Sequence, residues 1–172
     1  MQKSGIIEHM LGCFSPRFSG IILPVLLLVG TASSSLPADG PSIDEHGRER
    51  SVLAASFTNE KLWYWQKRLK LQDWNVSVAI VRSTELKPKT LGNIHWDTDK
   101  KTAIIRVLDP AEYQMPFREM LDDMEFTVVH ELIHLELAPV LNQFSRNEAN
   151  RREEEHAVNH MADALLRLQR GR

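Results

Sequence analysis

Phe126-Thr-Val-Val-His-Glu-Leu-Ile-His-Leu-Glu-Leu137 is the stretch of sequence that decides the fold. Residues four apart lie on one face of a helix, so the imidazoles of His130 and His134 can point at one metal ion. Apolar residues surround these histidines and Glu131, and a helix that is apolar on nearly all sides is predicted to be buried. Buried histidine and glutamate side chains need polar partners. This favours a metal site over the alternative, a solvated helix that carries two histidines by chance.

The order His130-Glu131-x-x-His134 is similar to the HExxH motif of zinc metallopeptidases. In that motif both histidines bind Zn²⁺, and the glutamate beside the first histidine acts as the general base on a metal-bound water. The resemblance implies that His130 and His134 are metal ligands and that Glu131 is the catalytic carboxylate. A catalytic zinc usually takes three protein ligands, so a third ligand is expected downstream.

A helix predicted over residues 146–168 offers the candidates for this third ligand. Its apolar stripe, which is expected to pack against the HExxH helix, consists of Val158, Met161, Ala162, Leu165 and Leu166. Glu155 lies on the stripe, three residues before Val158, and Glu154 lies close to it. The helical phase therefore favours Glu155 over Glu154, whereas Glu153 is predicted to be solvated. The alternative is that these glutamates only complement the helix dipole in its first turn.

Five other polar residues have alternative interpretations. His95 lies in a predicted strand, where it either lines a substrate groove or is simply exposed. Tyr113 precedes the HExxH helix and either donates a hydrogen bond to an oxyanion or packs in the core. His156 and His160 lie off the apolar stripe, so we predict that they are exposed; they are the next candidates if no glutamate approaches the histidines. Glu136 is predicted to face solvent.

Composition limits the kinds of metal site and partner. The 172-residue chain has 42% hydrophobic and 26% charged residues, which is typical of a soluble globular protein. Its 21 basic and 23 acidic residues give a net charge of −2, so no nucleic-acid partner is expected. The single cysteine, Cys13, excludes an internal disulfide and a cysteine-rich zinc finger. Metal binding must therefore depend on His, Asp and Glu.

The N-terminal third of the chain differs from the rest. Residues 1–32 contain the apolar run Phe18–Gly30, which favours either a secretory signal peptide or a leader upstream of a mis-assigned start. The first interpretation predicts a secreted or periplasmic protein and the second a cytoplasmic one, and the run is too short for a stable membrane span. Residues 33–56 are predicted to be a disordered linker. Residues 57–170 form the predicted domain.

Hydrophobic periodicity predicts how this domain begins. Thr58-Asn59-Glu60 suits a helix cap, and Leu62, Trp65 and Leu69 follow on one helical face. Three strands are then predicted, at residues 74–82, 92–97 and 102–108. The polar residues between the last two strands predict a hairpin turn.

The second half of the domain is predicted to be helical. Met115-Pro116 opens a long helix that runs through the HExxH motif to about Leu137, where Pro139 is expected to stop it. The glutamate-bearing helix then closes the domain. The predicted fold class is therefore α+β, with an N-terminal helix, a small three-stranded sheet, the HExxH helix and a C-terminal helix.

This order of elements resembles the small gluzincin-type zincins, which include the SprT-like and ImmA/IrrE-like metallopeptidases. The spacing from Glu155 through Val158 and Ala162 to Leu166 is similar to the ImmA/IrrE pattern, and the resemblance covers about residues 57–168. It implies a zincin-like fold, one Zn²⁺ and a peptide or protein substrate. The chain departs from that family because no proline closes the last helix and no DNA-binding module is appended.

The expected function is peptide-bond hydrolysis by a zinc-activated water, with Glu131 as general base and His130, His134 and Glu155 as zinc ligands. The alternative is a zinc-stabilised module that binds a protein or peptide without catalysis. The intact Glu131 favours the enzyme, since a purely structural metal site does not need that carboxylate. The sequence indicates neither the cleavage preference nor the oligomeric state.

Overall fold

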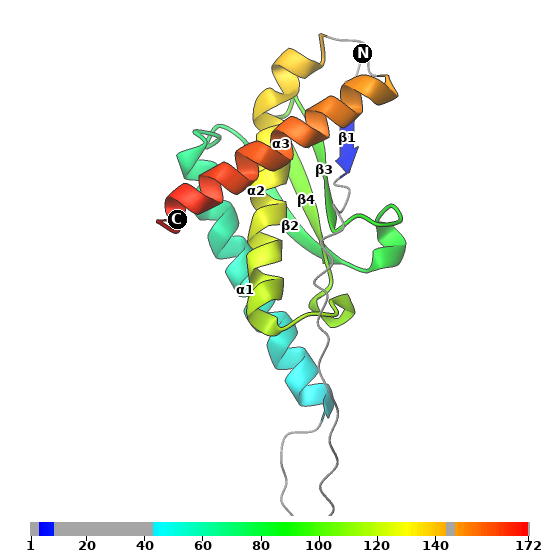
Figure 1. Ribbon diagram of the computed structural model, residues 1–172, viewed down its shortest axis with the longest axis vertical. Coiled ribbons are helices and arrows are strands. Elements are labelled where there is room, and N and C mark those ends of the chain that lie inside the picture. Colours follow the sequence, from blue (N-terminus) through cyan, green and yellow to red (C-terminus); the bar gives the residue numbers. More distant parts are fainter. Residues whose placement is uncertain (1–3, 9–42, 144–146, 172) are drawn as a thin grey trace, which may run out of the picture.

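The computed structural model describes residues 4–8, 43–143 and 147–171. Within these residues the fold is α+β, as predicted, with three α-helices and a four-stranded sheet (Figure 1). In chain order the elements are β1 (Ser4–Glu8), α1 (Ile43–Arg68), β2 (Asn75–Val81), β3 (Gly92–Asp97), β4 (Thr102–Leu108), α2 (Phe117–Leu141) and α3 (Glu148–Gln169). Two short 3-10 helices cover Ser83–Glu85 and Pro110–Glu112.

The sheet contains the three predicted strands and one more. Its order is β1-β3-β4-β2, in which β4 pairs antiparallel with β3 and parallel with β2. The predicted hairpin turn between β3 and β4 is confirmed: Oδ1 of Asp97 accepts hydrogen bonds from the backbone N–H groups of Asp99 and Lys100, both at 3.1 Å. The fourth strand, β1, comes from the segment that we predicted to be a leader, and it pairs antiparallel with β3.

Alternation along the strands places one face of the sheet in the core. Successive strand residues point to opposite faces, and the buried set from β3 and β4 comprises Ile94, Trp96, Ala103, Ile105 and Val107. Helix α2 packs against β3 and β4, and α1 packs against α2 and β2. Helix α3 crosses α2, as Figure 1 shows, so α2 lies between the sheet and α3. This central position buries the HExxH segment.

Helix α1 begins earlier than predicted, at Ile43 and not at Thr58. Residues 43–56, which we assigned to a linker, are therefore helical. Thr58 is not a cap, because its buried hydroxyl donates to the Ala54 carbonyl inside the helix, at 2.7 Å. The packed face of this first half consists of Arg50, Ala54 and Thr58, which are four residues apart. None of them is a large apolar residue, so the hydrophobic periodicity gave no signal there.

Helix α2 continues past its predicted stop. Pro139 lies inside the last turn, and the helix ends at Leu141. Proline removes only one backbone N–H, and the last turn keeps other partners: the N–H of Asn142 donates to the carbonyl of Ala138 at 3.0 Å. The side chain of Gln143 also donates to the carbonyl of Pro139, at 3.2 Å. These contacts allow the helix to run about one turn beyond its predicted end at Leu137.

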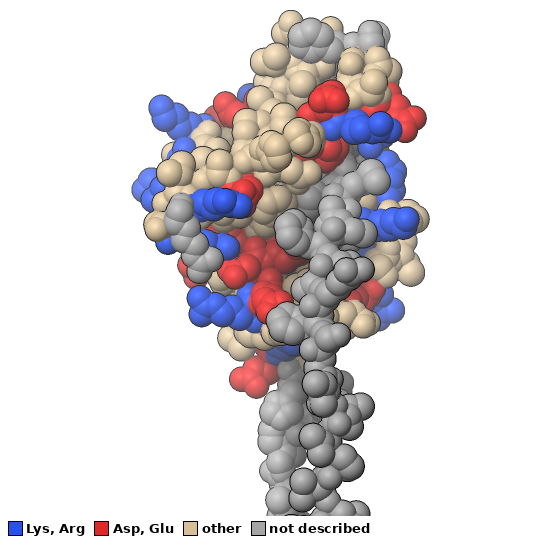
Figure 2. Space-filling view, viewed as in Figure 1, with Lys and Arg blue, Asp and Glu red and all other residues tan. Residues whose placement is uncertain are grey.

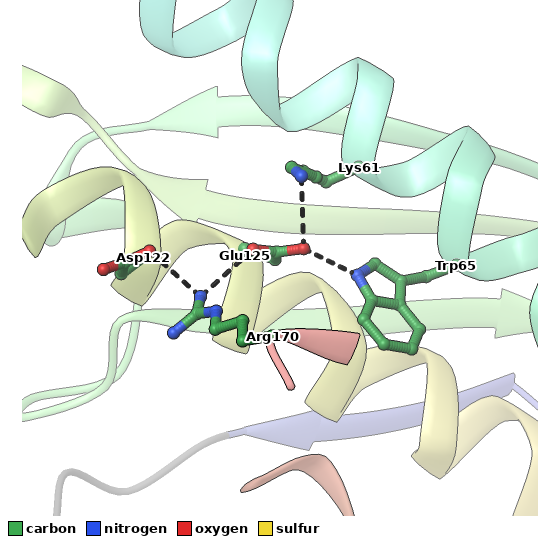
Figure 3. A network of polar contacts seen from close by, with 5 residues as sticks. All are labelled: Lys61, Trp65, Asp122, Glu125 and Arg170. Carbon is green, nitrogen blue, oxygen red and sulfur yellow. Dashed lines mark hydrogen bonds and ion pairs between the residues drawn. The ribbon is translucent and has the colours of Figure 1, made fainter. Parts of the chain in front are cut away.

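A buried ion-pair cluster fixes the end of α3 against the other helices (Figure 3). Glu125 on α2 is 3% exposed, and its carboxylate accepts a hydrogen bond from the Trp65 indole at 2.9 Å. Lys61 lies 3.4 Å from the same oxygen. Arg170, just after α3, contacts Glu125 at 3.1 Å and Asp122 at 3.0 Å. Because all its charges are paired, the cluster connects three helices without leaving an uncompensated buried charge.

Gly92 allows β3 to pass closely over α2. A Cβ at this position would contact Cγ2 of Thr127 and would lie 2.7 Å from the backbone carbonyl oxygen of Arg106. Because the carbonyl belongs to the sheet backbone, β3 would have to move, and we expect Gly92→Ala to lower the free energy of unfolding by about 1–3 kcal/mol. Urea denaturation measures this change.

Gly47 provides the matched control for that substitution. It is exposed on α1, and a Cβ there would meet no atom within 4 Å. Gly47→Ala should therefore be neutral or stabilise the protein by about 0.5–1 kcal/mol, because alanine loses less conformational entropy in a helix. Equal destabilisation by both substitutions would contradict the close approach of β3 to α2.

The predicted signal segment, Phe18–Gly30, lies outside the described residues, as does Cys13. In the part of the chain that the structure describes, no helix has the length and apolar character needed to cross a membrane. Figure 2 shows one face of the molecule, on which basic and acidic side chains of the described residues are interspersed.

Candidate metal centre

The three polar side chains of the HExxH segment are fully buried. His130, Glu131 and His134 are each 0% exposed, because α2 is covered by the sheet on one side and by α3 on another. Helical spacing places both imidazoles on the face that α3 crosses. The apolar neighbours Val129, Leu132 and Ile133 are buried as well, as predicted.

Helix α3 brings Glu155 to these histidines. Its N-terminal turn is fixed by Asn147, whose side chain accepts a hydrogen bond from the N–H of Asn150 at 2.8 Å. Val158, Ala162 and Leu166 are buried and anchor one face of the helix. The buried stripe is narrower than predicted, since Met161 is 38% exposed and Leu165 is only partly buried.

The three predicted ligands form a compact group. Nε2 of His130 lies 3.0 Å from Nε2 of His134. Oε2 of Glu155 lies 3.3 Å from Nε2 of His130, and Oε1 of Glu155 lies 3.6 Å from Nε2 of His134. In the part of the chain that the structure describes, these residues make up a group of potential metal ligands whose donor atoms all lie within 4.8 Å of one another.

The geometry of this group fits a tetrahedral zinc site. Zinc binds imidazole nitrogen and carboxylate oxygen at about 2.0–2.2 Å, which places neighbouring ligand atoms of a tetrahedron about 3.3–3.6 Å apart. The 3.0 Å between the two Nε2 atoms and the 3.3 Å from Nε2 of His130 to Oε2 of Glu155 lie near these values, and the 3.6 Å from Nε2 of His134 is to the other carboxylate oxygen, Oε1. Two neutral nitrogens and one carboxylate oxygen are also the donor types that zinc accepts at sites with an open position.

Glu154 approaches the other side of the same histidine pair. Its Oε1 lies 3.0 Å from Nδ1 of His134, and its side chain is 8% exposed. An ionised carboxylate can only accept a hydrogen bond, so Nδ1 of His134 must donate. This leaves the metal-facing Nε2 as the ring nitrogen with the free lone pair once the ring is neutral. The structure thus brings both candidate glutamates to the histidines, in different positions, while Glu153 is exposed as predicted.

The electrostatics of the group follow from its burial and its carboxylates. Burial alone would lower the pKa of His134, but hydrogen bonds to Glu154 and Glu155 and the charges of Glu131 and Glu155 raise it to about 9. Burial would raise the pKa of Glu155, but hydrogen bonds from both histidines lower it to about 2. The pKa of His130 is lowered, mainly by burial. These shifts favour one imidazolium, on His134, beside the Glu155 carboxylate in the metal-free group.

Zinc binding should release that proton. Because the metal-free pKa of His134 is about 9, zinc must displace a proton at neutral pH, and the apparent affinity should fall as the pH decreases below 9. Calorimetry at about pH 6, where a zinc-bound water with a pKa of about 7 stays protonated, in buffers of different ionisation enthalpy should show release of about one proton per zinc ion bound. A zinc affinity that is constant between pH 7 and 8.5 would contradict this protonation state.

The same raised pKa has a consequence for the metal-free protein. A group whose pKa is higher in the folded state stabilises the fold below its unfolded-state pKa. The contribution of His134 is therefore present below its ordinary value of 6.5 and is lost as the pH rises through about 9.

Substitution of the three consecutive glutamates should separate their roles. Glu155→Ala removes a ligand and should weaken zinc binding by more than 100-fold, whereas Glu154→Ala removes the partner of His134 and should weaken it by about 10–100-fold. Glu153→Ala is the matched control, since this side chain is exposed, and should change zinc affinity less than about twofold. Competition with a zinc-binding dye gives the three affinities. A larger effect from Glu154→Ala than from Glu155→Ala would mean that Glu154 is the ligand and Glu155 is not.

The remaining candidates do not join the group. His95 is partly exposed on the face of β3 that points away from α2, beside its partner Ile104 on β4. Tyr113 is buried, and burial with the nearby Asp123 raises its pKa. His156 and His160 are exposed and contact each other through tilted rings, with ring centroids 4.1 Å apart.

Sequence analysis missed one residue that acts on His130. The side chain of Asn159 lies near His130 and opposes the fall in its pKa. Asn159 lies four residues after Glu155, so it shares that face of α3. This spacing is visible in the sequence and could have predicted that Asn159, like Glu155, lies beside His130.

The chain was compared with protein-family models, with curated proteins and with solved structures, and none of the three comparisons gives a match. The function must therefore be argued from the geometry of the metal centre.

Proposed function

We propose that this chain is a zinc-dependent peptidase of the small gluzincin type, with a zincin-like domain and one zinc ion bound by His130, His134 and Glu155. The observation that carries this proposal is the position of Glu131, a fully buried carboxylate next to a group of three potential ligands. Structural zinc sites have four protein ligands, whereas catalytic sites have three and keep one position open. Among the described residues the group contains three, which favours catalysis.

Each residue has a defined part in the proposed reaction. Zinc, when bound, lowers the pKa of a coordinated water toward about 7. Glu131 accepts the water proton while the water oxygen attacks the carbonyl carbon of the peptide bond. The same carboxylate then delivers this proton to the amide nitrogen, the C–N bond breaks, and an amine and a carboxylate leave. Glu154 holds the imidazole of His134 in position during these steps.

A second candidate is a zinc-stabilised module that binds protein or peptide without catalysis. The observation that favours it is that His130, Glu131 and His134 are 0% exposed, which is typical of a closed structural site. Partial access remains at Glu155, whose side chain is 15% exposed. The two candidates agree on the ligands and differ in what Glu131 does.

Incubation of the full-length, zinc-loaded chain with a peptide library tests the proposal. Mass spectrometry should detect new peptide termini that disappear after removal of zinc by a chelator and return when zinc is restored. His130→Ala, prepared in parallel, excludes a contaminating peptidase, because it should give no such termini. Absence of cleavage at full zinc occupancy, in the wild type and in the strand variants described below, would favour the second candidate.

A further inference from the structure

Strand β1 closes one edge of the sheet. Ser4 to Glu8 pair antiparallel with β3, in a register that runs from Ser4 opposite Asp97 to Glu8 opposite Asn93. Because the sheet order is β1-β3-β4-β2, β3 would be an edge strand without this segment. Its outward N–H and C=O groups would then be free to pair with another extended chain.

The edge that β1 covers runs beside the metal-binding helix. Gly92, at the start of β3, lies against Thr127, which is one helical turn before His130. Further along β3, Ile94 and Trp96 are buried in the same core as α2. Figure 1 shows β1 and β3 on the side of α2 over which the N-terminal half of α3 passes, and that half carries Glu155. A chain paired with this edge therefore runs along β3, the strand that packs against the helix carrying His130 and His134.

Extended peptides bind open sheet edges through main-chain hydrogen bonds, which any sequence can form. A peptide that pairs with β3 needs the backbone groups that β1 already uses. We propose that residues 4–8 are a built-in competitor: they occupy the peptide-binding edge of β3, and an extended polypeptide can pair there only after they leave. The effect on catalysis rests on the proposed peptidase function, but the competition for the edge does not.

The competition has a quantitative consequence. If only a fraction of molecules has β1 detached, the apparent affinity for an added peptide is reduced by that fraction. The same fraction controls hydrogen exchange of the β3 amides that face β1, because they exchange only when β1 is detached. The factor by which β1 slows exchange of these amides in the wild type should therefore equal the factor by which peptide affinity rises when β1 is removed from the edge.

Paired proline substitutions in the full-length chain can detach β1 selectively. Backbone N–H groups of successive strand residues point in opposite directions, so residues 5 and 7 face one way and residues 6 and 8 the other. Leu91 and Leu108 form a hydrogen-bonded pair between β3 and β4, so by alternation the β3 residues opposite Gly5 and Ile7 bond to β1. Gly5→Pro/Ile7→Pro therefore loses two hydrogen bonds to β3, whereas Ile6→Pro/Glu8→Pro loses only N–H groups that face away. The second variant is the matched control, since proline is tolerated on the outer side of an edge strand.

The measurements are amide exchange by NMR and binding of a fluorescent peptide with the sequence of residues 2–10, with zinc content as the check on folding. Each lost hydrogen bond should shift the equilibrium between attached and detached β1 roughly fivefold toward detachment. The variant that loses two hydrogen bonds to β3 should therefore bind the peptide roughly 25-fold more tightly than the wild type. The exchange of the β3 amides should accelerate by the same factor, and the control should resemble the wild type. Equal peptide affinity in all three proteins, or unchanged β3 exchange, would overturn the proposal.

Hydrolysis rates separate this proposal from the proposed function. If the detached variant binds the peptide more tightly and no protein cleaves the library, competition for the edge stands and the peptidase function fails. If all three proteins cleave at equal rates, the peptidase stands and the competition is overturned. Faster cleavage by the detached variant alone supports both.

Discussion

Replacement of either His130 or His134 by alanine is expected to leave the purified chain without bound zinc. Each substitution removes one of the three proposed ligands, whose donor atoms lie within 4.8 Å of one another. The loss of affinity should exceed the roughly 100-fold upper value expected for removing Glu154 from His134. Thermal unfolding should also occur at lower temperature, since a ligand present at 1,000 times its Kd stabilises the native state by about 4.1 kcal/mol.

His156→Ala is the control for these two substitutions. His156 is exposed on α3, where its ring contacts that of His160 outside the buried group. The variant should keep the zinc content and the thermal midpoint of the wild type. Zinc that persists in His130→Ala and in His134→Ala, with loss only in His156→Ala, would place the metal on the surface of α3.

Glu131→Gln is expected to abolish peptide hydrolysis while zinc remains bound. The substitution keeps the size of a side chain that is 0% exposed and removes its ability to accept a proton. Because general-base catalysis contributes about 10²–10⁴-fold, cleavage should fall by at least that lower factor. Quantitative mass spectrometry of a cleaved library peptide measures the rate, and metal analysis confirms that zinc is retained.

Glu136→Gln provides the comparison within the same helix. Glu136 is exposed, so the substitution changes the net charge equally without altering the buried centre. Its hydrolysis rate should match that of the wild type. Equal rates for Glu131→Gln and wild type would remove the base from the proposed mechanism and would favour the non-catalytic module.

The elements that sequence analysis located best have strong periodic signals. Strands β3 and β4 were predicted at their observed bounds because β-branched residues and a polar turn delimit them. The group of His130, His134 and Glu155 was predicted from helical spacing, which fixes the faces of α2 and α3. The fold class follows from these elements.

What the sequence did not show depends on tertiary contacts. The first half of α1 packs through Arg50, whose guanidinium contacts the carbonyl of Met115 at 3.3 Å, and through small residues that carry no apolar period. Pro139 is accommodated because later backbone groups find other partners. The difference between Glu154 and Glu155 depends on the angle at which α3 crosses α2, which spacing along one helix cannot give.

X-ray absorption at the zinc edge of the zinc-loaded, full-length chain tests the central claim most directly. The account predicts about one zinc ion per chain with only nitrogen and oxygen ligands at about 2.0–2.2 Å, and with scattering from two imidazole rings. In Glu155→Ala one protein oxygen should be lost from this shell. A folded chain that takes up no zinc, or a spectrum without two imidazoles, would contradict the assignment of His130, His134 and Glu155 as the metal centre.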